Sequence, residues 1–204
     1  MKRALIFVSA ILVCCQTVYA GGRDILGRFH PGLEWGYTLT PASFHHYNYL
    51  DESIGFRIND EGWSFRPKSN AYIFGCITYD VSGYFSVSML SGIQGLDAGR
   101  RTLPLIMRME VSANGSDQDG FIFFSDMGAD IRNWSKHSNH FQIGSGYVII
   151  LAPRCSLGIR VGGRLLYDSP DIWDPIEEEY VSRRNIRRND AWYCALNMGL
   201  VLKF

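Results

Sequence analysis

Residues 191–204, AWYCALNMGLVLKF, decide the fold of this chain. At a period of two the stretch separates completely into two faces, which is the periodicity of a β-strand and not of a helix. The apolar face consists of Trp192, Cys194, Leu196, Met198, Leu200, Leu202 and Phe204. The opposite face consists of Tyr193, Ala195, Asn197, Gly199, Val201 and Lys203. The apolar column is roughly twice as long as an ordinary strand of about five or six residues. At ~3.3 Å per residue and a tilt of ~40° it is about 30 Å tall, the height of the apolar band of a bilayer. We therefore expect this stretch to be the closing strand of a membrane barrel.

The first twenty residues have the pattern of an export signal. Lys2 and Arg3 precede an apolar run over residues 4–13, and the small-residue pattern of residues 18–20 stands before Gly21. We expect residues 1–20 to be a signal peptide and residues 21–204 to form one barrel domain. The apolar run is too short to span a membrane, and nothing later in the chain approaches the ~18 consecutive apolar residues of a transmembrane helix. A membrane-embedded mature chain would therefore be a β-barrel.

Charge and cysteine content narrow the function classes. Removing Lys2 and Arg3 from the 20 basic residues leaves 18 against 20 acidic residues, so the expected mature chain is nearly neutral and predicts no nucleic-acid partner. Cys76, Cys155 and Cys194 remain, without the spacing of a metal or redox motif. We interpret them as small apolar fillers. A bridge from Cys76 to Cys194 requires a register that brings their Cα atoms within ~7 Å.

Alternation predicts a closed, up-and-down antiparallel barrel of eight strands. The expected strands cover residues 32–40, 71–79, 84–96, 103–111, 121–132, 141–151, 157–167 and 191–204. The strand at 71–79 is apolar on both sides, so its facing is ambiguous. Segment 41–70 is expected to be a loop with a protruding hairpin that turns at residues 60–62, or to extend the flanking strands. Connections after the first, third, fifth and seventh strands are polar and mostly longer, which is typical of surface loops with both chain ends in the periplasm.

The charged residues decide which face is inside, since a soluble barrel would also alternate. One face carries Glu34, Arg108, Glu110, Asp126, Asp130, Arg160, Arg164 and Lys203. An eight-stranded barrel is only wide enough for side chains, so the larger apolar set fits outside, where Trp35, Trp192 and Tyr167 can join aromatic girdles. The four acidic and four basic residues balance, as buried charges require. We interpret the set as a polar plug, with a proton or ion path as the alternative.

Two motifs contain residue types that can act in catalysis or metal binding, but neither predicts a catalytic residue, a cofactor site or a metal site. His137-Ser138-Asn139 resembles the His-x-Ser-Asn element of outer-membrane lipid A deacylases, but it lacks the spacer. On a strand the two side chains would point to opposite faces, which damages the bond from nucleophile to base. The neighbours His45 and His46 have no suitably spaced third ligand.

The segment 168–190 is expected to be a surface loop. It contains three consecutive glutamates at 177–179 and then the arginines Arg183, Arg184, Arg187 and Arg188. The opposite charges could simply pair in solvent. Alternatively, the four arginines could bind lipopolysaccharide phosphates, for which the bidentate geometry of arginine is suited.

The signal pattern, the eight alternating strands, the stretch IRRNDAWY before the last strand and the terminal Phe204 resemble the small outer-membrane β-barrel proteins common in Bacteroidota, which are Gram-negative. The resemblance implies an outer-membrane location, contact with outer-membrane lipid, and a role for Phe204 as the signal read by the barrel-assembly machinery. It also implies a structural or interaction role through the loops 41–70 and 168–190, or as an accessory subunit of a larger envelope complex. The alternatives are a lipid A or phospholipid modifying hydrolase and a narrow channel.

Overall fold

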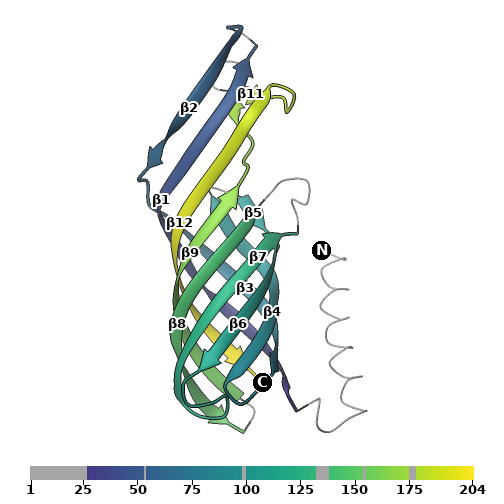
Figure 1. Ribbon diagram of the computed structural model, residues 1–204, viewed down its shortest axis with the longest axis vertical. Coiled ribbons are helices and arrows are strands. Elements are labelled where there is room, and N and C mark those ends of the chain that lie inside the picture. Colours follow the sequence, from purple (N-terminus) through teal and green to yellow (C-terminus); the bar gives the residue numbers. More distant parts are fainter. Residues whose placement is uncertain (1–26, 53, 98–99, 132–137, 154, 175–177) are drawn as a thin grey trace.

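The computed structural model describes residues 27–52, 54–97, 100–131, 138–153, 155–174 and 178–204. No helix in these ranges is long and apolar enough to cross a membrane. The expected signal peptide lies outside them. Eight of the described strands close into an antiparallel ring, because the last strand pairs with the first, which confirms the predicted fold class (Figure 1). In ring order they are β1 (Phe29–Asp51), β3 (Lys68–Asp80), β4 (Phe85–Asp97), β6 (Pro104–Ser112), β7 (Gly120–Asp130), β8 (Asn139–Ala152), β9 (Cys155–Asp168) and β12 (Ile186–Lys203).

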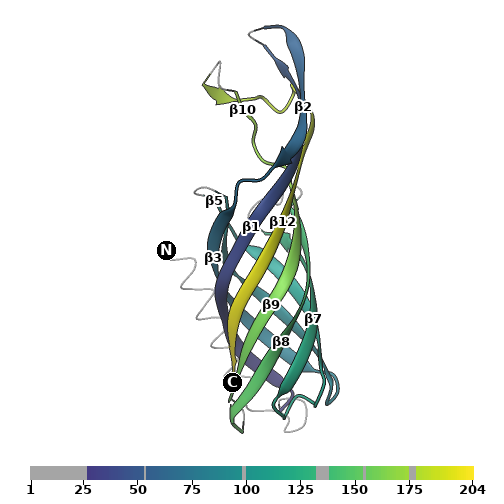
Figure 2. The same ribbon diagram turned by 90° about the vertical axis from the view of Figure 1, so that its left-hand side faces the viewer.

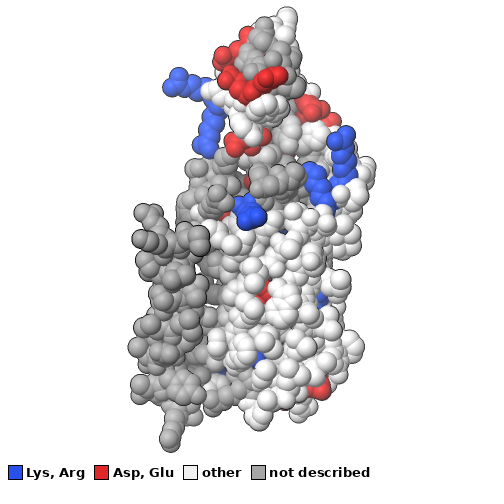
Figure 3. Space-filling model, turned by 180° about the vertical axis from the view of Figure 1, so that it is seen from behind, with Lys and Arg blue, Asp and Glu red and all other residues white. Residues whose placement is uncertain are grey.

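The strand faces follow the predicted alternation. In the closing strand Met198 is 61 % exposed on the outer wall, whereas its neighbour Asn197 is 5 % exposed inside the ring. The strand predicted to be ambiguous is resolved by the ring: Tyr72 and Phe74 are buried inside, and Ile73 points outward. Figure 3 shows the outer wall as almost uniformly uncharged, with the charged side chains gathered mainly at the upper end of the molecule.

Two of the ring strands continue beyond the barrel and form a protruding sheet. Pairing of β1 with β12 extends as far as Tyr49 and Ile186, and β2 (Phe56–Ser64) adds to the other side of β1. The transition lies at Pro41, where the β1–β12 register shifts between Leu39 and Ala42. Proline lacks the N–H that a regular ladder requires, so it suits a bulge. Figures 1 and 2 show this three-stranded sheet rising from one side of the barrel.

The predicted hairpin in segment 41–70 exists, but its predicted turn at residues 60–62 is wrong. Those residues lie inside β2, where Gly62 pairs with His45 in regular register. The chain turns instead before β2, where Gly55 adopts a φ of 70° and its N–H donates to the carbonyl of Asp51 at 3.0 Å. Only glycine adopts such a φ readily, and the Asp51 carboxylate accepts a further bond from the N–H of Ile54 at 3.3 Å.

Two further connections at the same end also contain short strands. β5 (Arg100–Thr102) pairs with β4, and β10 (Trp173–Asp174) pairs with β11 (Glu179–Tyr180). The prediction that 168–190 is entirely loop is therefore wrong, since β12 already begins at Ile186. The cause is tertiary, because the pairing of Tyr49 with Ile186 holds this polar segment in a strand that has no hydrophobic alternation of its own.

The opposite end of the barrel has short connections and both ends of the described chain. In the connection between β3 and β4, the Ser82 hydroxyl accepts bonds from the N–H groups of Tyr84 and Phe85, at 3.3 and 3.1 Å. The N–H of the terminal Phe204 donates to the carbonyl of Pro31 at 2.8 Å. The start of β1 and the end of the chain therefore meet at one mouth, which we call the lower mouth (Figure 1).

Candidate functional site

The centre of the barrel contains a continuous chain of ion pairs, which we call the ion-pair chain. In order of contact its members are Lys203, Glu110, Arg160, Glu34, Arg108 and Asp126. At its lower end the Lys203 ammonium donates to Glu110 Oε1 at 2.9 Å, and Arg160 Nη2 donates to the other oxygen of the same carboxylate. Arg160 then reaches Glu34 through Nη1 at 3.1 Å.

Arg108 is the hub of the upper half of the ion-pair chain. Its Nε and Nη2 donate to the two oxygens of Asp126 at 2.7 and 2.8 Å, which is a bidentate pair. Its Nη1 and Nη2 also donate to the Glu34 carboxylate, which accepts a further bond from the Tyr72 hydroxyl at 3.3 Å. Arg108, Glu34 and Asp126 are buried, so each charge is balanced by a partner instead of by water.

An aromatic ring lies against both arginines, a contact that was not predicted from the sequence. The Arg108 and Arg160 guanidinium carbons lie 4.8 and 5.8 Å from the centre of the Phe124 ring. The face of an aromatic ring attracts such cations. Tyr72 lies on the strand whose facing was ambiguous from the sequence, and Phe124 is an apolar residue on an inner face that was predicted to be polar. Strict alternation from Asp126 would have placed Phe124 inside.

Two residues of the predicted charge set lie inside the barrel but outside the ion-pair chain. Arg164 Nη1 donates to the amide oxygen of Gln94 at 2.8 Å, which is a neutral acceptor. Asp130 Oδ1 accepts the N–H of Leu103 at 3.3 Å near the upper rim. The six members of the ion-pair chain thus balance as three acids and three bases. This arrangement supports the polar plug, because the barrel axis is filled by paired side chains.

β1 and β12 pack closely against each other at Gly36. A Cβ placed on Gly36 would lie 2.1 Å from the carbonyl oxygen of Met198 and 2.6 Å from the Cα of Gly199. These are backbone atoms, which cannot give way as a flexible side chain would. Glycine at this position therefore permits the approach of β1 to β12 that closes the barrel.

A polar cavity of about 410 Å³ opens at the lower mouth. His30 and Asp80 form a pair across its rim at 3.1 Å, and Cys155 contributes to its wall. Glu110 and Lys203, the lower end of the ion-pair chain, also line it. The cavity therefore reaches the plug from the lower mouth.

An aromatic row crosses from the barrel onto the protruding sheet. Tyr167 and Trp192 have ring centres 4.9 Å apart, and Phe44 pairs with Trp192 on one side and Trp63 on the other. The Phe44 and Trp63 ring centres are 5.4 Å apart, and Phe65 stacks next to Trp63 at 6.2 Å. We call these five residues the aromatic row. The sequence did not predict that Phe44, Trp63 and Phe65 would join Tyr167 and Trp192.

The third residue expected in an aromatic girdle lies elsewhere. Trp35 pairs with Leu200 and Ile73, which are aliphatic residues of the outer wall. At the lower end of the barrel, other rings meet: Phe29 with Tyr79 at 4.8 Å, and Phe121 with Tyr147 at 5.2 Å.

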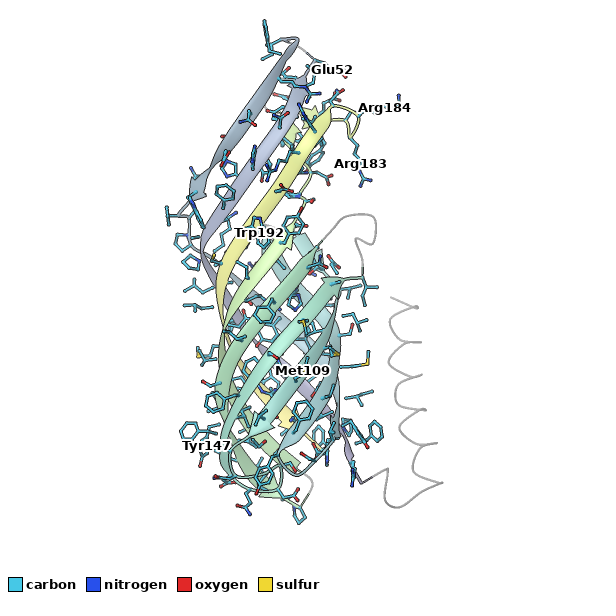
Figure 4. All side chains as sticks on the ribbon, viewed as in Figure 1. Glu52, Met109, Tyr147, Arg183, Arg184 and Trp192 are labelled. Atoms are coloured by element: carbon cyan, nitrogen blue, oxygen red, sulfur yellow. The ribbon has the colours of Figure 1, made fainter. Side chains whose placement is uncertain are left out.

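The four arginines predicted to bind lipopolysaccharide are separated by the fold. Arg183 and Arg184 lie at the far end of the protruding sheet, well away from Trp192 (Figure 4). Ile186, the first residue of β12, is six strand residues beyond Trp192, about 20 Å at ~3.3 Å per residue. This position does not favour contact with phosphates at the membrane surface.

Arg187 and Arg188 lie within β12, on opposite faces of the protruding sheet because successive strand residues alternate. The Arg188 guanidinium donates to Asp190 at 2.5 Å. Partial burial acts to raise the pKa of Asp190, but hydrogen bonds from Arg188 and from Tyr167 outweigh it and hold that pKa below its ordinary value. Arg188 therefore already has an acidic partner.

The histidine and serine candidates are not brought into a reactive arrangement. His45 and His46 fall on opposite faces of the sheet, where His45 pairs with Asp60 at 3.1 Å and His46 with Glu61 at 3.5 Å. The described ranges hold no group of three or more His, Cys, Asp or Glu residues placed to bind a metal. His137 lies outside the described residues, and Ser138 next to it is buried.

The three described cysteines are free. Cys76 is buried inside the ring and pairs with Gly32, whereas Cys194 faces outward and pairs with Ala42 and Leu165. A bridge between Cys76 and Cys194 is therefore excluded, because their side chains project to opposite sides of the barrel wall.

No protein-family model matches the sequence, and no curated protein does. Among solved structures, the chain is similar to the outer membrane protein OprG from Pseudomonas aeruginosa, with 11 % identity over 86 % of this chain and 95 % of that chain and a TM-score of 0.43. A second, more distant likeness is to InvG, the secretin of the Salmonella SPI-1 type III secretion injectisome, with 7 % identity over 100 % of this chain and 63 % of that chain and a TM-score of 0.23.

Proposed function

We propose that this chain is an integral outer-membrane β-barrel with the lower mouth in the periplasm and the protruding sheet at the cell surface. The outer wall supports this placement. Below the protruding sheet, the outward side chains that the structure describes on the ring strands are uncharged, and the large ones, such as Met198 and Leu196, are exposed. A charge at the bilayer midplane of such a wall costs about 2–4 kcal/mol, so this composition suits lipid.

The proposed role is interaction with another envelope protein, through the protruding sheet. The observation that carries it is the edge of β2. In the part of the chain that the structure describes, β2 pairs only with β1, over nine residue pairs without a register shift. Its second edge offers a regular row of backbone donors and acceptors, which is a template for a further strand.

Position-specific photo-crosslinking tests this role. A photoreactive amino acid at Phe56, an exposed residue of β2, introduced in cells and followed by mild-detergent extraction, is expected to yield a discrete crosslinked product to a second protein. The matched control is Val81, an exposed residue in the turn at the lower mouth. A product from Val81 alone, or none from either site, would reject the role of the β2 edge. A mature chain that stays soluble and monomeric without detergent would reject the membrane placement.

The two alternatives have less support. In a narrow channel, ions would have to pass the ion-pair chain that lies inside the barrel. Planar-bilayer recordings of the purified barrel are therefore expected to show no conductance. Discrete conductance steps would favour the channel. A lipid A or phospholipid modifying hydrolase predicts that His137→Ala alters the mass spectrum of lipid A or phospholipid in cells. An unchanged spectrum is the outcome we expect.

A further inference from the structure

The aromatic row continues beyond the barrel wall, and this continuation needs an explanation. Tyr167 and Trp192 belong to ring strands and stand at the upper edge of the apolar wall. Trp63 belongs to β2, which lies outside the ring, and Phe65 follows directly after β2. Their side chains are 57 % and 75 % exposed. Two large, exposed aromatic side chains thus lie outside the barrel wall and continue the row that begins with Tyr167 and Trp192.

The tilt of the strands sets the level of these side chains. The ring strands lean as Figure 2 shows, so a row that runs from β9 through β12 to β1 climbs away from the lower mouth. With a strand spacing of ~4.8 Å and a tilt of ~40°, the climb is roughly 3 Å per strand. Trp63 therefore stands about 9 Å above Tyr167. The headgroup layer on each side of the hydrocarbon core is about 5–7 Å thick. β2 runs antiparallel to β1, back toward the barrel, so Phe65, two residues after Trp63, stands roughly 5 Å lower at ~3.3 Å per residue. Phe65 consequently lies at headgroup level and Trp63 just above it, and neither lies among acyl chains.

A polar ladder stands directly above the aromatic row on the same face of the sheet. His46 bonds to Asn59 at 3.1 Å, and Asn59 accepts from Asn48 at 3.0 Å. Arg57 donates to Asn48 at 3.2 Å. These groups are held in fixed positions by one another and retain further donors and acceptors. The same face also holds two carboxylates, Glu61 at 3.5 Å from His46 and Asp190 paired with Arg188. Planar aromatic rings below and a row of amide, imidazole, guanidinium and carboxylate groups above form a surface complementary to sugar rings and their hydroxyl groups.

We propose that this outer face of the protruding sheet binds the saccharide head groups of lipopolysaccharide in the surrounding outer leaflet. Trp63, Phe65 and Phe44 stack on sugar rings, and the polar ladder donates to their hydroxyl and phosphate oxygens. The occupant follows from continuity, because the face is an unbroken extension of the lipid-facing wall at the level of the head groups. The proposal rests on the outer-membrane placement proposed above, and it moves the contact from the distant Arg183 and Arg184 to the base of the sheet.

The test measures binding of purified lipopolysaccharide to the folded, detergent-solubilised protein, with lipid A lacking core sugars as the second probe. The double variant W63A/F65A is expected to bind lipopolysaccharide about tenfold more weakly, since it removes two stacking side chains. Trp63→Tyr, which keeps an aromatic ring, is expected to restore most of the affinity. Both variants are checked for folding by their mobility on gels without heating.

The matched control is Trp173→Ala, because Trp173 is also exposed but contacts Tyr180 in the β10–β11 hairpin. It is expected to bind like the unmodified protein. Equal binding by W63A/F65A, or an equal loss in Trp173→Ala, would overturn the proposal. So would lipid A binding that matches lipopolysaccharide binding and falls equally in W63A/F65A. The crosslinking result at Phe56 is independent of these outcomes, because Phe56 lies on the opposite face of β2 from the polar ladder, so failure of the protein-interaction role and failure of the saccharide site are distinguishable.

Discussion

Replacing Arg108 by methionine is expected to destabilise the barrel by about 3–5 kcal/mol, the cost of removing one partner from a buried ion pair. Asp126 would lose both donors, at 2.7 and 2.8 Å, and would remain buried as an unpaired carboxylate. Glu34 would lose less, because Arg160 at 3.1 Å and Tyr72 at 3.3 Å still donate to it. Methionine has a similar length and can still lie over the Phe124 ring. The loss of stability therefore reports the missing charge more than missing volume.

A second substitution separates charge imbalance from lost packing. In the double variant R108M/D126N the unpaired carboxylate is replaced by a neutral amide, and we expect it to regain at least about half of the stability lost in R108M, as coupled neighbours do. The matched control is Arg188→Met, which breaks the pair with Asp190 on the protruding sheet. That exposed pair is screened by water, so this variant should unfold at nearly the same urea concentration as the unmodified protein.

The assay is urea unfolding of each variant in lipid vesicles, followed by tryptophan fluorescence and by the mobility of the folded barrel on gels. A loss below about 1 kcal/mol in R108M would refute the reasoning, since it would mean that water or another group already compensates the buried carboxylate. A double variant no more stable than R108M would refute it as well, because the unpaired charge would then not be the cause.

Three further predictions follow from the packing and the exposed charges. In the same urea assay, Gly36→Ala is expected to lower the free energy of unfolding by about 1–3 kcal/mol or to block folding, because its Cβ would meet backbone atoms. The control Gly163→Ala, which has open space around its Cβ, should change that free energy by less than about 0.5 kcal/mol. Cys155, at the cavity of the lower mouth, should be the only described cysteine that reacts with a membrane-impermeant maleimide in the folded protein embedded in lipid. Labelling of Cys76 would contradict its inward facing, and labelling of Cys194 would contradict the lipid contact of the outer wall. The pKa of Asp190, measured by carboxyl-carbon NMR, should lie below its ordinary value and should rise in Arg188→Ala. Because the folded-state pKa is lowered, the ionised Asp190 carboxylate stabilises the fold above the unfolded-state pKa, and this contribution is lost as pH falls through the folded-state pKa. An unchanged pKa in that variant would show that the hydrogen bond is not the cause.

The strands of the barrel were predictable from the sequence because each carries its own evidence. An outer strand face in lipid and an inner face among side chains impose alternation residue by residue, so the period of two in residues 191–204 reports both the strand and its facing. The errors fell where local signals compete. Asp60, Glu61 and Gly62 have turn composition, but the chain turns where Gly55 adopts a positive φ next to the Asp51 carboxylate. Pairing with β1 holds the polar start of β12 in a strand.

What the sequence alone determined is therefore the class of the fold, the sidedness of its strands and the balanced charge of its interior, since these depend on local period and composition. The tertiary structure alone decided which residues meet. Glu34 and Arg108 are 74 residues apart, and whether they touch depends on the register and tilt of the three strand pairs that lead from β1 to β6 around the closed ring. The same tilt carries the aromatic row off the barrel onto β2. No local pattern contains that information, because stagger between strands is a property of the closed ring as a whole.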